Sequence, residues 1–134
     1  MATTTARIII ESSDLLSDPL NLDVSGQLKQ AGASTGLVGA TGIGRKNTLS
    51  VSEYTLFSAA DFTDNKAAKV YLKNTSTTAT EYFIIKHGTM SIGRLYAGDW
   101  AFYPWDGAAD IKITPSVGTL ITLEHCVFMD EPTS

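Results

Sequence analysis

Cysteine, histidine and basic residues are all scarce in this chain, and each shortage narrows what the protein can do. The 134 residues contain one cysteine, Cys126, so an internal disulfide is excluded, and its apolar neighbours predict a buried structural thiol. The two histidines, His87 and His125, fall in different predicted strands and lack the spacing of a metal site. Motifs typical of serine hydrolases, zinc peptidases and phosphate-binding loops are missing. The sequence therefore predicts no enzyme, no metal and no cofactor.

Positive charge is also too sparse and too scattered for a nucleic-acid partner. The chain has 10 Lys and Arg against 14 Asp and Glu, a formal net charge of −4. Binding to phosphates needs a clustered basic face, so we expect no nucleic-acid binding. The longest β-branched run near the start, Ile8 to Ile10, is far too short to span a membrane, so no membrane partner is expected. Asp99, Asp106 and Asp110 lie near predicted turns and fit turn-forming roles better than a calcium loop.

Helical periodicity is lacking, and alternation of apolar and polar residues takes its place. Leu20, Leu22 and Val24 alternate with polar residues, which predicts a strand with one buried and one wet face. Residues 47–57 read as one strand with Leu49 and Val51 pointing inward. Seven to nine short strands, spaced about ten residues apart, predict an all-β fold, either a β-sandwich or a jelly roll.

One domain of residues 1–134 is expected, with two segments of different composition. Residues 1–7 are small and polar and predict a flexible N-terminal arm. Residues 31–45 hold five glycines and predict a long flexible loop. Gly42 and Gly44 give this loop a slight likeness to a nucleotide-binding turn, but the strand-to-helix context of such a turn is missing. Contact with a partner subunit is the better interpretation of the loop.

The aromatic segment 100–105 is the best candidate for contact with another molecule. Trp100, Phe102 and Pro104 share one parity, whereas Tyr103 and Trp105 share the other, so both faces of this strand are aromatic. One face should lie in the core, and the other should be covered by a neighbouring subunit or open for binding. Alternatively, Trp100, Tyr103 and Trp105 could form a stacking platform for a carbohydrate.

The segment Val70-Tyr71-Leu72-Lys73-Asn74-Thr75, followed by Tyr82 to Ile85 and then Ile92 to Trp105, resembles small virion proteins of tailed bacteriophages. The likeness covers about forty residues: a strand, a Lys-Asn-Thr turn, a second strand, then a short turn ending in an acid and an aromatic strand. It looks most like a capsid cement or decoration protein, or a related tail component.

The resemblance implies a non-enzymatic structural protein, often a homotrimer, that binds the major capsid protein on the exterior of the head. Such a protein would be made in the host cytoplasm and would stabilise the shell. The alternative is a phage tail or host-recognition module that binds a surface glycan. The candidate interface residues are Arg7, Gly36, Gly39, Gly42, Trp100, Phe102, Tyr103 and Trp105.

Overall fold

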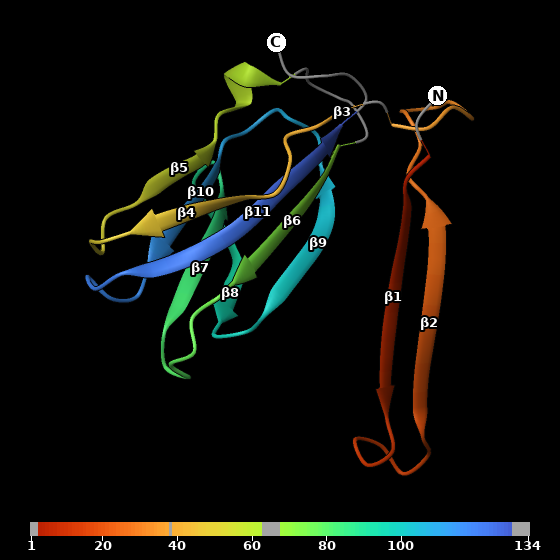
Figure 1. Cartoon of the computed structure of the whole chain (residues 1–134), viewed down its shortest axis with the longest axis horizontal. Helices are drawn as coiled ribbons and strands as arrows, with labels where there is room; N and C mark the ends of the chain where they lie inside the picture. The colour runs from red at the N-terminus through yellow and green to blue at the C-terminus, as the bar shows by residue number, and fades with distance from the viewer. Residues whose placement is uncertain (1–2, 38, 63–67, 130–134) are drawn as a thin grey trace.

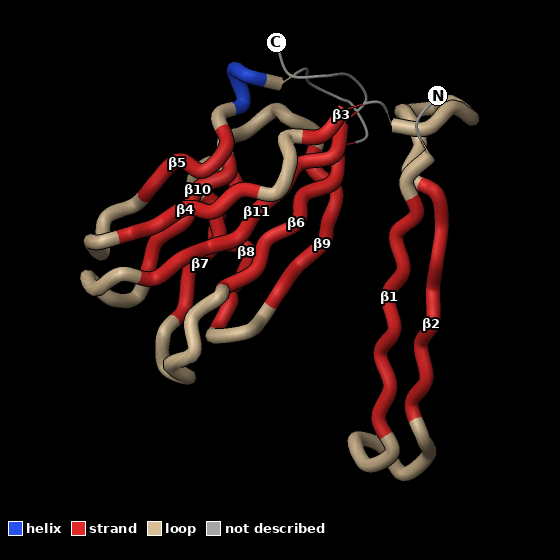
Figure 2. The backbone as a smooth tube through the Cα atoms, in the orientation of Figure 1, coloured by secondary structure: helices blue, strands red, loops and turns tan. Residues whose placement is uncertain are grey.

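The computed structural model describes residues 3–37, 39–62 and 68–129, and these are built almost wholly of strands (Figures 1 and 2). A single 3₁₀ turn, η1 (Ala59–Asp61), is the only helical element of the described residues. The strands are β1 (Thr5–Ser12), β2 (Leu20–Gln27), β3 (Gly39–Ala40), β4 (Gly44–Thr48), β5 (Tyr54–Phe57), β6 (Ala68–Asn74), β7 (Tyr82–His87), β8 (Met90–Tyr96), β9 (Trp100–Trp105), β10 (Ile111–Pro115) and β11 (Ile121–Met129).

Two antiparallel sheets pack face to face, and a separate hairpin lies beside them. One sheet has the order β5-β10-β7-β8, and the other has the order β3-β11-β6-β9 with β4 also paired to β11. Strands β1 and β2 form a two-stranded sheet of their own. In Figure 1 this hairpin stands beyond β9, apart from the sandwich. The prediction of an all-β fold with packed antiparallel sheets, as in a β-sandwich, is therefore confirmed.

The core lies between the two sheets and follows the period of two along each strand. In β6 every second residue is buried, with Val70 and Leu72 fully inaccessible and the residues between them partly exposed. Facing them from the other sheet are Phe83, Ile111 and Ile113, also fully buried. Burial of large apolar side chains at this density supplies most of the stability of a domain of this size.

Asn74, at the end of β6, is a buried polar residue that ties the two sheets together. Its side-chain amide donates to the carbonyl oxygens of Leu95 (2.9 Å) and Glu81 (3.3 Å), and its Oδ1 accepts from the Ser76 N–H (3.0 Å). Its backbone N–H also donates to the Asp99 carbonyl (3.0 Å). The turn after β6 thus depends on this asparagine, whose short amide side chain both donates to and accepts from the nearby backbone.

The segment 47–57 differs from its prediction, because it contains two strands that belong to different sheets. Strand β4 ends at Thr48 and β5 begins at Tyr54, and the chain crosses between sheets in the residues between them. Leu49 and Val51 lie in this corner and are well exposed, so their predicted inward orientation is wrong. Alternation cannot reveal a change of sheet, because it continues through a corner as readily as along one strand.

The predicted arm and loop also contain regular structure. Thr5 to Arg7 belong to β1, where they pair with Ser25 to Gln27, so the arm of residues 1–7 is not separate from the first strand. Residues 1 and 2 lie outside the described residues. Within residues 31–45, Gly39 lies in β3 and Gly44 begins β4. Gly44 is needed for close approach, since a Cβ there would come within 2.7 Å of the His125 ring.

Candidate protein interface

The hairpin β1–β2 has one apolar face and one polar face. Its register sets Ile8 opposite Val24 and Ile10 opposite Leu22, and such directly paired side chains share a face. Ile10, Leu22 and Val24 are each 43–54% exposed, so this face is uncovered. The predicted buried face of β2 is therefore corrected: the face is apolar, but no described residue of the same chain covers it.

The opposite face of the hairpin is polar and carries a well-formed ion pair. Arg7 donates through Nε to Asp23 Oδ1 (3.0 Å) and through Nη2 to Asp23 Oδ2 (2.8 Å). This bidentate contact raises the pKa of the Arg7 guanidinium. Because both groups are well exposed, the pair contributes little to stability and serves mainly to fix the strand register. Arg7, a predicted interface residue, therefore lies on the wet face of the hairpin.

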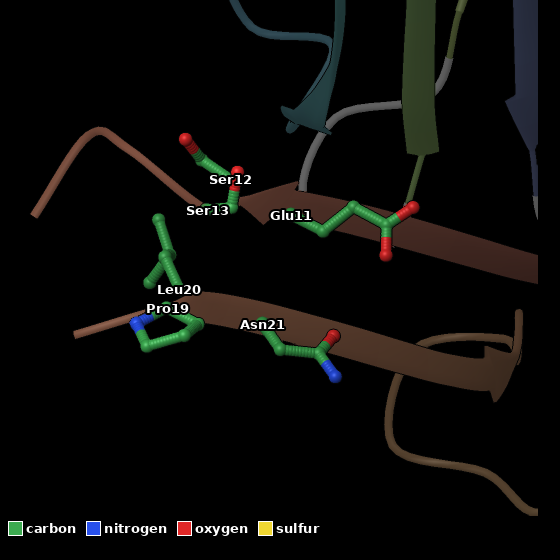
Figure 3. Close-up of a pocket in the computed structure, with 6 residues that line it drawn as sticks. All are labelled: Glu11, Ser12, Ser13, Pro19, Leu20 and Asn21. Atoms are coloured by element: carbon green, nitrogen blue, oxygen red, sulfur yellow. The ribbon is translucent and has the colours of Figure 1, made fainter.

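A shallow hollow of about 400 Å³ lies at the far end of the hairpin, where β1 ends and β2 begins (Figure 3). It is lined by Glu11, Ser12, Ser13, Pro19, Leu20 and Asn21. Glu11 is the single ionisable side chain of this lining, which cannot supply the paired acid and base that most hydrolytic chemistry requires. Beyond the hollow, Leu15 and Leu16 are exposed at the tip and extend the apolar surface of the hairpin.

The outer face of the five-stranded sheet is the second uncovered apolar surface. Trp100 and Phe102 of β9 pair with Lys73 and Tyr71 of β6, all pointing away from the core. Trp100 is half exposed, and the Phe102 ring packs edge-on against Phe128 at 6.2 Å between centroids. We name this surface the outer aromatic face; it consists of Tyr71, Trp100, Phe102 and Phe128.

The other two aromatic residues of β9, Tyr103 and Trp105, point inward. Trp105 is 3% exposed, packs against Phe57 and Phe62, and donates from Nε1 to the Ala109 carbonyl oxygen (2.9 Å). The Tyr103 hydroxyl lies 3.2 Å from His87 Nε2, and burial raises the pKa of Tyr103. Trp100, Tyr103 and Trp105 therefore do not form a common stacking platform, since alternate residues of a strand point to opposite faces.

The free edge of strand β8 is the third uncovered apolar surface. Met90 and Ile92 are exposed, and β8 pairs on one side only, with β7. A cleft of about 120 Å³ opens between β8 and β9, lined by Ile85, Ile92, Gly93, Arg94, Leu95, Ala101 and Tyr103. An unpaired edge with an apolar cleft beside it offers backbone hydrogen bonds and an anchoring pocket to a partner strand.

The predicted glycines of the interface are separated by the structure. Gly36 lies at the base of the hairpin, where it pairs with Lys29. Gly39 lies in β3 beside Met129 of β11, and Gly42 occupies an exposed turn with a φ of 78°. A positive φ is readily available to glycine alone, which accounts for Gly42 without reference to a partner. An interface role for these three glycines stays a prediction.

The His, Cys, Asp and Glu side chains of the described residues form no cluster that could hold a metal ion. No group of three or more His, Cys, Asp and Glu side chains converges within residues 3–37, 39–62 and 68–129. Asp99 and Asp106 accept backbone N–H bonds from Tyr96 and Ala108 within their own turns, so their predicted turn roles are confirmed. The Asp110 carboxylate instead accepts from the distant Ala59 N–H, so it joins two segments and its predicted turn role is not confirmed. Cys126 is buried, as predicted, and burial raises the pKa of its thiol. Among the described segments, no helix has the length and apolar character to cross a membrane.

His125 should make stability depend on pH. Burial lowers the pKa of His125 below its ordinary value of 6.5, and nearby Lys46 lowers it further. The unfolded chain then binds a proton before the folded chain does as the pH falls, so the free energy of unfolding decreases from pH 7.5 through 6.5 to 5.5. We expect His125→Gln to make this decrease shallower, measured by urea unfolding at each pH.

Glu53→Gln is the control for this titration. Lys86 lowers the pKa of Glu53 below 4.5, so its contribution to stability is lost only at still lower pH. The slope between pH 7.5 and 5.5 should be unchanged in this variant. An equally steep decrease in His125→Gln and wild type would contradict the assignment to His125.

No family model, curated protein or solved structure matches the chain. The structure defines an all-β sandwich with a projecting amphipathic hairpin and three uncovered apolar surfaces. Sequence reasoning identified the aromatic strand and the apolar face of β2, but it assigned that face to the core and missed the β8 edge. The β-branched run before the short loop 13–19 and the alternating segment after it could have signalled the hairpin.

Proposed function

We propose that this chain is a non-enzymatic structural protein of a tailed-phage virion, a cement or decoration protein that binds and stabilises the capsid shell. The observation that carries the proposal is the amount of apolar surface left uncovered on three regular elements: the hairpin, the outer aromatic face and the β8 edge. Exposed apolar residues gathered on regular elements often mark contacts with other proteins, and subunits of an assembly expose such surfaces before they meet their neighbours.

The strand order supports the proposal. We infer that β4 to β11 form a jelly roll, because lettering these eight strands B to I turns the two sheet orders into B-I-D-G and C-H-E-F. Jelly rolls of two four-stranded sheets are common in viral capsid proteins and also in lectins. Fold alone does not decide between these functions. The inward orientation of Tyr103 and Trp105 disfavours the glycan-binding alternative in its predicted form, because the platform of Trp100, Tyr103 and Trp105 on which it depended is not formed.

The proposed assembly uses different surfaces for different neighbours. In this scheme the protein is a homotrimer on the capsid exterior, and the β8 edge contacts the major capsid protein. A strand of the shell would pair with β8, and an apolar side chain would enter the cleft beside Ile92. Binding to the assembled shell but not to its separated subunits would shift the equilibrium toward the shell.

Substitution of Ile92 tests the shell contact. We expect Ile92→Asp to weaken binding to heads at least tenfold, because the variant buries a charge in the proposed contact. The measurement is co-sedimentation with heads assembled from the major capsid protein of the same genome, together with the temperature at which those heads dissociate. Wild-type protein should raise that temperature, and the variant should raise it much less.

Leu49→Asp is the matched control, because Leu49 is also an exposed aliphatic residue but lies in the corner between β4 and β5. It should bind heads as the wild type does. Absence of wild-type binding to heads would refute the capsid role, and equal loss in both variants would refute the β8 edge as the contact.

A further inference from the structure

The hairpin and the outer aromatic face are both incomplete surfaces in a single chain. A two-stranded hairpin alone is at best marginally stable in water, and this one leaves Ile10, Leu22 and Val24 exposed. The five-stranded sheet likewise leaves Trp100 half exposed, with Phe102 beside it. In Figure 1 the hairpin lies next to the sandwich beyond β9, and no other strand pairs with it.

We infer that the apolar face of the hairpin of one copy docks on the outer aromatic face of a second copy, in a closed ring where every copy gives and receives one hairpin. The inference goes beyond the proposed function, since it concerns contacts between copies and requires no capsid.

The charges of the two surfaces are complementary. Residues 5–27 carry four carboxylates, Glu11, Asp14, Asp18 and Asp23, against the one guanidinium of Arg7. On the outer aromatic face Lys69 and Lys73 flank Tyr71 along β6. Glu124 of β11 also lies on this face. Its carboxylate accepts a hydrogen bond from the Tyr71 hydroxyl (2.8 Å) and forms an ion pair with Arg45 (3.4 Å). The hairpin is therefore net negative, whereas Lys69, Lys73 and Arg45 outnumber Glu124 on the outer face, so the two surfaces attract at long range. Glu11 and Asp23 lie on the hairpin face turned away from the contact, so this attraction acts without direct ion pairs from them.

The estimated contact area favours an arrangement in which every copy both gives and receives a hairpin, because one docked hairpin alone buries too little surface. Eight residues per strand give a hairpin about 26 Å long and about 10 Å wide, or roughly 250 Å² on one face. One docked hairpin then buries about 500 Å² over both partners, which is below what a stable interface needs. In a closed ring every copy takes part in two such contacts, so its removal exposes about 1,000 Å², which reaches the lower limit for a specific interface.

The connection between hairpin and sandwich favours exchange between copies. The base of the hairpin is fixed by hydrogen bonds from the Leu28 N–H to the Thr4 carbonyl and from the Leu37 N–H to the Leu28 carbonyl. Both leucines are buried. A hairpin fixed at its base in this way projects as one unit (Figure 1) and can contact a neighbouring copy without rearrangement of the sandwich.

Adjacent isoleucines on opposite faces of β1 give the test. Ile10 lies on the apolar face and is 48% exposed, whereas Ile9 lies on the polar face and is 49% exposed. We expect Ile10→Asn to weaken self-association at least tenfold and Ile9→Asn to change it less than twofold. The measurement is solution mass by light scattering over a concentration series, with circular dichroism to confirm folding. Phe102→Ser, on the receiving face, should reproduce the effect of Ile10→Asn without touching the hairpin.

A cross-link identifies the surfaces directly. Native Cys126 is buried, so cysteines introduced as Leu22→Cys on one chain and Phe102→Cys on another should join those two chains after mixing and oxidation. The inference is supported by a wild-type dimer or trimer that is weakened by Ile10→Asn and Phe102→Ser but not by Ile9→Asn. A wild-type monomer at tens of micromolar, equal effects of the two isoleucine variants, or cross-linking only within a doubly substituted chain would overturn it. These experiments contain no capsid heads. A negative result would therefore refute the contact between copies without bearing on shell binding, which Ile92→Asp tests separately.

Discussion

Replacement of Phe83 by alanine should remove about 3–5 kcal/mol from the free energy of unfolding. Phe83 is fully inaccessible at the centre of the core, where β7 faces the buried residues of β6 and β11. Truncation loses the transfer energy of the ring and leaves a cavity that a sandwich closed by two sheets cannot easily collapse. A domain of ordinary stability would lose a large part of its total of about 5–15 kcal/mol. Urea unfolding followed by tryptophan fluorescence measures the change.

Phe102→Ala is the matched control for Phe83→Ala, because Phe102 is the same residue type on the opposite side of the sandwich. Phe102 is partly exposed on the outer aromatic face. We expect it to reduce the stability of the single chain by less than about 1.5 kcal/mol, while weakening self-association. Equal destabilisation by the two substitutions would show that the outer face is part of the folding core and would contradict its role as an interface.

Asn74→Leu should cost roughly 2–4 kcal/mol, although leucine has nearly the same shape. The substitution leaves the Leu95 and Glu81 carbonyls and the Ser76 N–H without the side-chain partners they have in the native protein. The Leu95 carbonyl is buried with the asparagine, so it cannot form a replacement hydrogen bond with water. An unsatisfied buried polar group costs its full desolvation energy, so the loss exceeds that of an ordinary surface hydrogen bond. Thermal and urea unfolding of the variant measure the effect.

Asn47→Leu provides the comparison, since Asn47 is exposed on β4 and accepts one bond, from the Thr122 hydroxyl at 2.8 Å. Its loss should be within about 0.5–1 kcal/mol. If Asn74→Leu were no more destabilising than Asn47→Leu, the connection between the sheets through Asn74 would have no energetic significance.

The strands could be predicted from sequence because their burial repeats every second residue. The aromatic parity in β9 separated the two faces correctly without saying which is inside, and the structure puts Trp105 inside and Trp100 outside. The apolar face of β2 was also recognised from Leu20, Leu22 and Val24. Periodicity reveals that a face is apolar, but it does not say which molecule covers it. For this reason the hairpin was expected to be buried within one chain.

Long-range features of the fold escaped prediction for a different reason. The crossing between β4 and β5 puts neighbouring residues into separate sheets, and no local signal marks it. The requirement for Gly44 comes from the ring of His125, which is distant in sequence, so the glycine was interpreted as a source of flexibility. The β8 edge was missed because a strand's position within a sheet depends on pairings that a single strand does not encode.

The pairing of β4 with β11 has a consequence for the order of events during synthesis. Thr48 donates to the Ile121 carbonyl across 73 positions of sequence, so the sandwich cannot close until nearly the whole chain has left the ribosome. All-β domains with such distant contacts fold in milliseconds to seconds, whereas a local hairpin forms in about 1–10 μs. The hairpin strands are thus synthesised and can begin to pair while the sheet that would receive them is still incomplete. Incomplete chains translated from the same mRNA carry the hairpin but lack the outer aromatic face. Their association is therefore delayed until each chain is complete.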